Sequence, residues 1–514
     1  MSTTTTLVAT LTTLSEHGDE LADLPDDVGM LEVRADLVGD LDVDWLRQRF
    51  AGQLLYTLRS AAEGGEGSDD PTVRARRVSA AAAAGYDLID LEAERDRTEA
   101  IFDAVPRAKR LVSWHGVSSH LQDLRDRFHH VAARPARYYT MIPTAAGASD
   151  GVHALALLRE LKRDDLVLFA AGAQGTWTRP LAPRLGSPLV YGAFGGVPGA
   201  PGQLSIARLR RDYGLPALPP VERLYGIVGR PVLHSLSPRL HNGAYRAFDL
   251  PALYVPFHAE SFGDFWIDVV ESGSLEALGL PLGGLSVTAP YKAVALAVSG
   301  ASSPRAQHIN AANTLVCHEG VWEAESTDPE GVTEALRARG ATIEGRTAAV
   351  VGCGGAGKAA AFGLQLAGGR VTLINRGRER GMQASEELHL PFVPLDDFDP
   401  AAYDVIVHAT ALGHHDDDPL PFATDALDAS STVVEMVYGR EPTPLVRAAE
   451  AQGAVAIDGR DVLLYQALGQ FRLMTRRVLD AGLARQLLDL GELPPRPPSA
   501  NELRPRDAAP EASA

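Results

Sequence analysis

The sequence predicts an α/β protein in which a (β/α)8 barrel is followed by a second α/β domain and by a Rossmann domain. Three observations support this prediction. Short apolar runs alternate with helical stretches, a proline-rich segment interrupts the alternation, and a glycine-rich turn follows a later apolar run. Alternation of strand and helix along the chain is typical of parallel sheets covered by helices.

The barrel prediction rests on the first part of the chain. Short runs rich in β-branched and aromatic residues recur there, each followed by a helical or loop stretch. The eight runs lie at residues 6–10, 29–34, 53–58, 86–92, 109–114, 136–142, 166–171 and 188–194. The count of eight favours a closed barrel. An open, doubly wound sheet is the alternative, because the same alternation also permits it.

The segment GLPALPP at residues 214–220 is unsuited to a helix or a central strand and predicts a linker. After it the alternation resumes with the strand LYGIVG at 224–229, and the chain ends in a stretch rich in Pro, Ala and charge, which predicts disorder. The expected parts are a barrel at 1–215, a linker at 216–222, a second α/β domain at 223–328 and 460–490, a Rossmann domain at 329–459 and a disordered tail at 491–514.

Composition excludes several classes of protein. The net charge of −18, without a basic stripe, argues against nucleic acid and anionic membranes as partners. No apolar run reaches the roughly 20 residues that span a bilayer, and the N-terminus lacks the basic start of a secretory signal. Only two cysteines occur, Cys317 and Cys353, which favours the reducing cytoplasm. The sequence does not indicate an oligomeric state.

The glycine-rich turn predicts a dinucleotide site. Gly352, Gly354 and Gly357 follow the strand TAAVV and open a helix, so the backbone can approach a pyrophosphate at the helix N-terminus. The next strand ends in Asn375-Arg376 instead of an acidic residue, and Arg380 follows. Cations at this point favour the 2′-phosphate of NADP. The alternative is that the arginines belong to a solvated helix start.

Lysine is rare in this chain, because only Lys109, Lys162, Lys292 and Lys358 stand among its 48 basic residues. Lysine can release a proton and arginine cannot, so each lysine is a candidate for chemistry. Lys292 ends the segment VTAPYK, and Asp328 ends STD just before the Rossmann domain. A ketone reduction needs a proton donor near the new oxygen, and a lysine oriented by an aspartate can serve. A loop lysine is more commonly solvated.

These segments together suggest a family. HSLSP at 234–238 with His241-Asn242, then VTAPYK, AANT, STD, GCGGAG and Asn375-Arg376 resemble the shikimate dehydrogenases in order and spacing, from residue 224 to about 480. The resemblance implies reversible reduction of 3-dehydroshikimate to shikimate with NADP. It also implies that Lys292 and Asp328 form the catalytic pair.

The resemblance implies the remaining ligands as well. Ser235 and Ser237 would hold the substrate carboxylate, and Thr288, Asn313 and Gln466, with the catalytic pair, would hold its hydroxyls. Tyr438 and Gly459 would complete the cleft wall. The implied cofactor residues are Gly352, Gly354, Gly355, Ala356, Gly357, Asn375, Arg376, Arg380 and Gly459.

The chain departs from the family at three polar positions. Ser286 and Ser326 stand where asparagine is usual, and we expect these changes to tune affinity. His408 also replaces a common asparagine, near the expected nicotinamide. The alternative for this half is a relative that acts on quinate with NAD, and Arg376 and Arg380 argue against it.

Polar residues cluster after the barrel runs, at the strand ends where barrel enzymes place their sites. The expected pocket consists of Glu32, Arg34, Arg59, Glu92, His115, Arg179 and Gln203. Its arginines would suit a carboxylate. The segments LEVRAD, YTLRSAAEGG, IDLEAE, SWHG, GTWTR and PGQ resemble the type I 3-dehydroquinate dehydratases over about residues 5–205. That activity produces 3-dehydroshikimate from 3-dehydroquinate, and fusions of the two families exist.

One departure from the dehydratase family bears directly on activity. The family acts through a lysine that forms a Schiff base at the end of the sixth strand, where this chain has Thr140 or a neighbour. Lys109 and Lys162 precede their strands, on the opposite face of the barrel. A hydroxyl cannot form an imine. The alternative to a dehydratase is a non-catalytic binding or assembly module.

We expect no metal site. The cluster His414-His-Asp-Asp-Asp418 follows a strand in a loop without fixed ligand spacing, and is interpreted as a solvated loop. His129 and His130 are adjacent on a predicted helix and therefore point in different directions.

Overall fold

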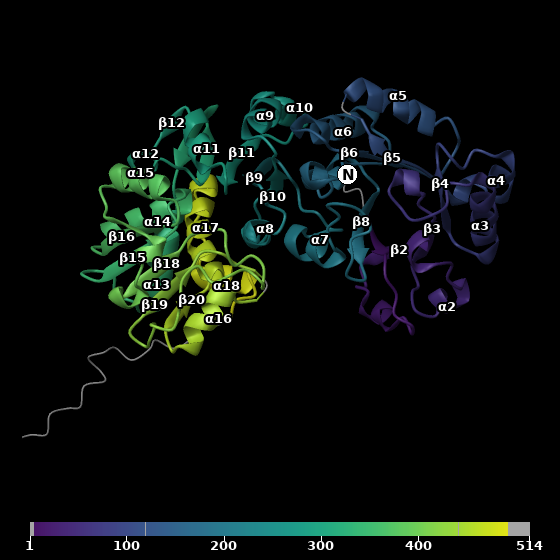
Figure 1. Cartoon of the computed structure of the whole chain (residues 1–514). Coiled ribbons are helices and arrows are strands. Elements are labelled where there is room, and N and C mark those ends of the chain that lie inside the picture. The colour runs from purple at the N-terminus through teal and green to yellow at the C-terminus, as the bar shows by residue number, and fades with distance from the viewer. Residues whose placement is uncertain (1–4, 119, 440, 492–514) are drawn as a thin grey trace, which may run out of the picture. The chain divides into compact units, whose positions relative to one another are not determined.

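The computed structural model describes residues 5–118, 120–439 and 441–491. Within these residues the chain forms three β-sheets of eight, six and six strands with helices between them, so the predicted α/β class is confirmed (Figure 1). Beyond Gly491, the predicted tail at 491–514 lies outside the described residues. Two compact units divide the chain, Met1–Val298 with Leu315–Glu323, and Ser299–Thr314 with Ala324–Ala514.

The first sheet is a nearly closed parallel barrel with the strand order β7-β6-β5-β4-β3-β2-β1-β8. Each of the eight predicted runs contains or overlaps one strand, so the barrel prediction is confirmed. The strands are β1 (Thr6–Leu11), β2 (Val28–Arg34), β3 (Gln53–Thr57), β4 (Leu88–Glu92), β5 (Arg110–Val117), β6 (Tyr138–Thr144), β7 (Leu166–Leu168) and β8 (Leu189–Phe194).

Side chains alternate between the two faces of each barrel strand. Glu32 and Arg34 are two residues apart on β2 and share a face, as do Asp90 and Glu92 on β4. The intervening apolar residues, such as Val33, are buried on the other face. The strands therefore bring charged side chains into the barrel at their carboxyl ends while packing apolar ones outward.

Helices of the barrel begin and end at sequence signals. In α3, Pro71 stands at the first turn and Asp70 Oδ1 accepts hydrogen bonds from the amides of Thr72 (2.8 Å) and Val73 (3.0 Å). The helix ends at Gly85, whose φ of 108° lies in the region that favours glycine. The helices are α1 (Ala35–Val38), α2 (Val43–Arg47), α3 (Pro71–Ala84), α4 (Glu99–Ala104), α5 (Leu121–Val131), α6 (Ala148–Leu161) and α7 (Ile206–Tyr213).

The second sheet has the strand order β10-β9-β11-β13-β14-β12. Its strands are β9 (Arg223–Gly229), β10 (Ala252–His258), β11 (Leu282–Val287), β12 (Ala301–Ser302), β13 (Thr314–His318) and β14 (Val321–Glu325). β9 pairs in parallel with both β10 and β11, so these carboxyl ends share one edge. The associated helices are α8 (Ser237–Ala247), α9 (Phe262–Phe265), α10 (Ser274–Ala277), α11 (Lys292–Val298) and α12 (Pro304–Ile309).

Within the first unit the barrel packs on the second sheet. Trp177, in the short helix η4 (Ala173–Thr178) after β7, is 2% exposed, and its ring centroid lies 5.2 Å from that of Phe257 on β10. The buried Asp212 of α7 accepts hydrogen bonds from Arg208 and from Arg239 of α8, both at 3.1 Å. An apolar contact and a buried carboxylate thus join the two sheets.

The third sheet is parallel along the order β17-β16-β15-β18-β19-β20, as expected for a Rossmann domain. The order reverses between β15 and β18, the place where such sheets bind ligands. Its strands are β15 (Thr347–Val351), β16 (Arg370–Asn375), β17 (Phe392–Pro394), β18 (Val405–His408), β19 (Thr432–Glu435) and β20 (Val455–Ile457). Its unit also contains α13 (Asp328–Ala338), α14 (Gly355–Leu366), α15 (Arg378–Leu388), α16 (Pro444–Ala451), α17 (Gly459–Thr475) and α18 (Ala481–Leu487).

Among the described residues, none of the helices is both long and apolar enough to cross a membrane.

Candidate functional site

The barrel gathers the polar residues of the expected pocket at the carboxyl ends of its strands. Glu32 accepts hydrogen bonds from the hydroxyls of Thr10 on β1 (2.7 Å) and Thr57 on β3 (2.8 Å). Gln203, in the segment after β8, donates to the Thr10 hydroxyl at 3.1 Å. Residues from β1, β2, β3 and the last loop of the barrel are therefore joined by direct hydrogen bonds.

Arg59 is the central cation of this group and is buried. Its guanidinium forms salt bridges with Asp90, with Glu92 at 3.2 Å and with Glu63 at 3.3 Å, and donates to Ser113 Oγ at 3.0 Å. Burial alone would lower the pKa of Arg59, but the charges of Asp90, Glu92 and Glu63 outweigh it and raise the pKa. Arg59 stays charged and holds β4, β5 and the β3 loop together.

His115 on β5 is oriented by Glu63. The carboxylate of Glu63 accepts the backbone N–H of His115 at 3.0 Å and lies 3.2 Å from Nδ1. Burial, together with the charges of Arg59, Arg34 and Arg179, holds the pKa of His115 well below its usual value. The imidazole is neutral near pH 7, and burial raises the pKa of Glu63 to about 8. Once Glu63 is ionised it accepts Nδ1–H, and Nε2 can then accept a proton.

The other two arginines of the pocket differ in their partners. Arg34 pairs with Asp36 at 2.7 Å and donates to the carbonyl of Gly199 at 2.9 Å. Arg179 is 4% exposed, stacks over Phe169 and donates to a backbone carbonyl of β8 at 3.0 Å. Within the described part of the chain Arg179 forms no salt bridge, and burial lowers its pKa to about 10. An anionic ligand would supply the charge that Arg179 lacks.

The lysines of the barrel lie where the sequence predicts. Lys109 ends a short helix just before β5 and donates to the carbonyl of Tyr86 at 2.9 Å, and Lys162 caps α6 before β7. Both positions are at the N-terminal ends of the strands. Thr140 is buried on β6 beside Ser113 of β5, in register. The carboxyl end of the described barrel strands carries no amine.

In the second sheet, Ser235, Ser237, Thr288 and Lys292 lie beyond neighbouring strands. Ser235 and Ser237 follow β9 and are buried, and Ser237 opens α8. The Thr288 amide donates to the carbonyl of Val228 at 3.0 Å, and Lys292 opens α11. β9 and β11 are paired, so the loops that carry these residues leave the same edge of the sheet.

In the second unit, Asn313 and Asp328 are in direct contact. Asn313 Nδ2 donates to Asp328 Oδ1 at 2.8 Å and to the Thr327 hydroxyl at 3.0 Å, and both Asn313 and Asp328 are buried. Asp328 opens α13, which packs against α17. Gln466 lies on α17 where that helix passes Gly331 of α13. Gln466 and Asp328 therefore belong to two packed helices.

The glycine-rich turn has the geometry that a dinucleotide needs. Gly352 follows β15 with a φ of 112°, and a Cβ on Gly357 would lie 1.8 Å from the Gly352 carbonyl oxygen. A Cβ on Gly354, in contrast, would meet nothing within 4 Å. The first and last glycines are required by the turn itself, whereas Gly354 leaves open space before the N-terminus of α14, where Gly355, Ala356 and Gly357 form the first turn.

Arg376 and Arg380 follow β16 and are exposed. Asn375 Oδ1 accepts the backbone N–H of Cys353 at 3.3 Å, which ties the end of β16 to the glycine-rich turn. Burial raises the pKa of the Cys353 thiol to about 11 against the lowering effect of Arg380 and then Lys358, so Arg380 acts electrostatically on this turn.

The last two expected residues lie near the start of α17. Tyr438 is half-buried in the loop after β19. Gly459 opens α17, and a Cβ there would lie 2.3 Å from the carbonyl oxygen of Val437. Glycine at 459 lets the helix approach this loop closely.

A buried pair at the carboxyl end of β18 was not predicted. His408 Nδ1 lies 2.9 Å from Glu435 Oε1 with both side chains fully buried, and His408 Nε2 lies 2.5 Å from the Thr410 hydroxyl. Glu435 also accepts the Thr443 hydroxyl at 3.1 Å. The departure at 408 was visible in the sequence, but its partner lies 27 residues away on the neighbouring strand.

Sequence reasoning also missed one acidic member of the barrel pocket, Asp90, although Glu63 after Arg59 was among the polar residues at the strand ends. Asp90 faces inward two residues before Glu92, and the alternation within LIDLE was the signal that would have found it. Glu63 stands four residues after Arg59 and pairs with it. Burial raises the pKa of Asp90 to about 6, although Arg59 opposes this.

Known proteins resemble both halves of the chain. The shikimate dehydrogenase (NADP(+)) of Syntrophobacter fumaroxidans is 36% identical over 253 residues, which are 48% of this chain and 85% of that protein. This chain belongs to the shikimate dehydrogenase family. The enzyme of the same name from Halobacterium salinarum is 38% identical over 263 residues, covering 51% of this chain and 96% of that protein.

Family models divide the chain in the same way. The shikimate dehydrogenase substrate binding domain matches residues 227–315, and the type I 3-dehydroquinase family matches residues 6–217. The chloroplastic bifunctional 3-dehydroquinate dehydratase/shikimate dehydrogenase of Arabidopsis thaliana is 28% identical over 481 residues, covering 86% of this chain and 78% of that protein. The chain joins a type I 3-dehydroquinase domain to its dehydrogenase domains, as predicted.

The depressed pKa of His115 predicts a pH dependence of stability. Near the ordinary histidine pKa of 6.5, His115 takes up a proton in the unfolded chain but not in the folded protein. His115 therefore does not lower the free energy of unfolding above that pH, and it lowers it progressively as the pH falls below 6.5. We expect His115→Asn to lose less stability than the wild type between about pH 8 and about pH 5.5. Urea unfolding at both values measures this. The exposed His129→Asn is the control, and identical pH dependence in wild type and His115→Asn would contradict it.

Proposed function

We propose that the C-terminal half reduces 3-dehydroshikimate to shikimate, reversibly, with NADPH. The observation that carries this proposal is the identity of 36% to a shikimate dehydrogenase (NADP(+)), 85% of which is covered. The open space at Gly354 and the exposed arginines after β16 support the cofactor assignment. The partners are small molecules, and the scarcity of cysteine supports the cytoplasm as the compartment.

For the domain limits, we retain the division proposed from the sequence: a barrel at 1–215, a linker at 216–222, a substrate-binding domain at 223–328 and 460–490, and a cofactor-binding domain at 329–459. The matches at 6–217 and 227–315 support the first two boundaries.

The proposed cofactor site uses the backbone of the glycine-rich turn for the pyrophosphate. Its amides at Gly354–Gly357 and the N-terminus of α14 favour a negative charge. Arg376 and Arg380 would hold the 2′-phosphate beside Asn375. When bound, NADPH supplies the hydride that reduces the ketone. The remaining chemistry is a proton transfer, which falls to the protein.

Lys292 is the proposed proton donor to the carbonyl oxygen, with Asp328 as its acidic partner. Asn313 holds Asp328 through a hydrogen bond of 2.8 Å, which limits the directions that the carboxylate can take. Ser235 and Ser237 would bind the substrate carboxylate, and Thr288, Asn313 and Gln466 its hydroxyls, with Tyr438 and Gly459 at the cleft wall.

We propose that the barrel binds a small carboxylate and that its dehydratase activity is absent or very low. Arg179, without a salt bridge among the described residues, would bind the carboxylate, and Glu32, Arg34, Arg59, Glu92, His115 and Gln203 would surround the ligand. His115 and Glu63 could move a proton, but an imine requires an amine inside the pocket. The barrel would then serve as a binding or assembly module.

The cofactor proposal predicts a preference for NADPH over NADH that depends on two arginines. Replacing both Arg376 and Arg380 with alanine should lower kcat/KM for NADPH at least tenfold and leave that for NADH nearly unchanged, because a hydrogen bond to a charged group contributes about 1.5–3 kcal/mol. Steady-state kinetics with both cofactors measures this. Arg378→Ala, which removes a cation paired with Asp397 at 3.8 Å, is the matched control. An unchanged preference would favour the NAD-dependent quinate relative.

The assignment of Lys292 predicts a loss of turnover without a loss of cofactor binding. Lys292→Ala should lower kcat by about 10²–10⁴-fold, the range for a general acid. Lys292→Arg should not restore it, because arginine keeps the charge but cannot release the proton. NADPH binding, followed by nicotinamide fluorescence, should be unchanged in both variants. A loss of less than about tenfold would reduce Lys292 to a residue that positions the substrate.

The barrel proposal predicts that no Schiff base forms with 3-dehydroquinate. β5 alone is 8 residues long, and at about 3.3 Å per residue it holds Lys109 far from the carboxyl ends of the strands. Borohydride reduction in the presence of 3-dehydroquinate, followed by mass spectrometry, should therefore leave residues 1–215 unmodified. Thr140→Lys, which returns an amine to the buried face of β6, is the comparison variant. A reduced adduct on the wild-type barrel would overturn the proposal.

A further inference from the structure

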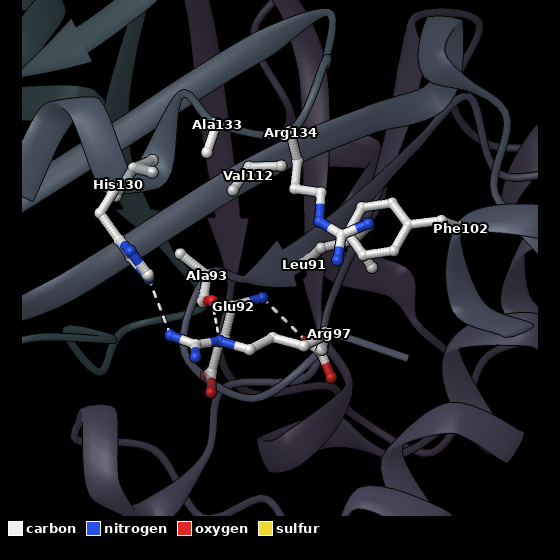
Figure 2. Close-up of a pocket in the computed structure, with 11 residues that line it drawn as sticks. Leu91, Glu92, Ala93, Arg97, Phe102, Val112, His130, Ala133 and Arg134 are labelled. Atoms are coloured by element: carbon white, nitrogen blue, oxygen red, sulfur yellow. Dashed lines mark hydrogen bonds between the residues drawn. The ribbon is translucent and has the colours of Figure 1, made fainter. Parts of the chain in front are cut away.

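A pocket of about 170 Å³ lies against the outer face of the barrel, beside the carboxyl end of β4. It is formed by β4, β5, α4, α5 and the segments that follow β4 and α5 (Figure 2). Its lining residues are of three kinds. Leu91, Ala93, Val112, Phe102, Val131 and Ala133 are apolar, and Arg97, His130 and Arg134 carry nitrogen donors or acceptors. Glu92 and Asp96 are acidic, and each is paired with a buried arginine, Glu92 with Arg59 and Asp96 with Arg74.

The apolar part of the lining comes from the strands. Leu91 on β4 and Val112 on β5 point outward from the barrel, because they alternate with the inward-facing Glu92 and Ser113. Glu92 directs its carboxylate at Arg59 inside the barrel. The pocket and the barrel interior are therefore on opposite sides of the same two strands.

On one side of the pocket, two guanidinium groups lie close to one phenyl ring. Arg134 lies over the Phe102 ring at 4.4 Å and Arg110 at 4.9 Å from the ring centroid. Arg110 is fixed by hydrogen bonds to the carbonyls of Val105 and Phe102 at 2.6 Å each. In the described part of the chain, Arg134 has no carboxylate partner, so the Phe102 ring orients it while its N–H groups can still take an anion.

Arg97 lies on the other side of the pocket (Figure 2). Its Nε donates to the Ala93 carbonyl at 2.9 Å, and its Nη2 lies 2.7 Å from His130 Nε2. Arg97 also pairs with Glu94, which is shared with Arg127. One carboxylate between two arginines leaves this side positive.

The sequence around the pocket is basic in an acidic chain. Residues 91–137, which include the whole lining, contain nine lysines and arginines and seven aspartates and glutamates, whereas the whole chain has a net charge of −18. Burial lowers the pKa of Arg110 and the neighbouring charge of Arg134 lowers it further, as expected where cations gather. A local excess of positive charge attracts a small anion.

We propose that this pocket binds a small aromatic carboxylate. The carboxylate would pair with Arg134, with Arg97 and His130 on the opposite side, and the ring would lie on Leu91, Val112 and Phe102. An apolar cavity of about 150 Å³ takes up benzene, so a pocket of about 170 Å³ has room for one ring. The charged part of the lining argues against a purely apolar ligand, and the volume of the pocket is too small for a dinucleotide.

Benzoate is the probe, and isothermal titration of the full chain is the measurement. Benzoate should bind, acetate more weakly because it lacks the ring, and benzylamine not at all because its charge is opposite. Arg134→Ala should weaken benzoate at least tenfold, as expected for the loss of a charge-assisted hydrogen bond. Phe102→Leu should weaken benzoate without changing acetate. Arg137→Ala, an exposed arginine outside the lining, is the matched control and should bind as the wild type does.

Two further variants keep the result decisive. Arg179→Met removes the guanidinium inside the barrel, so benzoate binding that survives in Arg179→Met and is lost in Arg134→Ala belongs to the outer pocket and not to the barrel interior or to Ser235 and Ser237. Ala133→Glu places an acid in the lining and should abolish binding even if Arg134→Ala folds poorly. No benzoate binding up to about 10 mM, equal binding in wild type and Arg134→Ala, or binding lost only in Arg179→Met would each overturn the proposal.

Discussion

Parallel pairing of strands is the constraint on which the sites of this chain depend. Neighbouring parallel strands end on the same edge of their sheet, so side chains from distant parts of the sequence meet there without any further device. In the barrel this brings Glu32 of β2, Arg59 after β3 and His115 of β5 together. In the Rossmann sheet it brings the glycine-rich turn after β15 beside the ends of β16 and β18.

The same constraint decides what each site lacks. A residue placed before a parallel strand is kept at the other edge, and this separates Lys109 and Lys162 from the barrel pocket. The pocket retains the charges that organise a ligand site. Arg59 is held by three carboxylates, whereas Arg179 is buried and forms no salt bridge with the described residues. Carboxylate binding and imine chemistry are therefore separable in this barrel, and only the first is supported by its side chains.

Much of this arrangement could be predicted from the sequence. The eight apolar runs identify the barrel strands to within two or three residues at most of their ends, because their β-branched and aromatic residues stand between turn signals. The dinucleotide turn is readable because Gly352 and Gly357 are required by sterics within a few residues. The resemblance to the two families, carried by the order of their motifs, assigned roles to residues for which composition alone predicted none.

What could not be predicted depends on pairs that are distant along the chain. Arg74 and Asp96 form a fully buried salt bridge at 2.7 Å, and His408 pairs with Glu435 across neighbouring strands. The sequence around either residue of such a pair does not indicate which residue will be its partner. The outer pocket could not be predicted for the same reason, since Phe102, Arg110 and Arg134 come from three separate segments of the chain.

We propose that one chain carries an NADPH-dependent dehydrogenase and a barrel that binds a carboxylate but does not dehydrate 3-dehydroquinate. The test supplies the purified protein with NADPH and follows the oxidation of NADPH by its nicotinamide absorbance. With 3-dehydroshikimate the account predicts immediate oxidation of NADPH. With 3-dehydroquinate it predicts none until a separate dehydratase is added. Oxidation of NADPH with 3-dehydroquinate alone, at a rate comparable to that with 3-dehydroshikimate, would contradict the account.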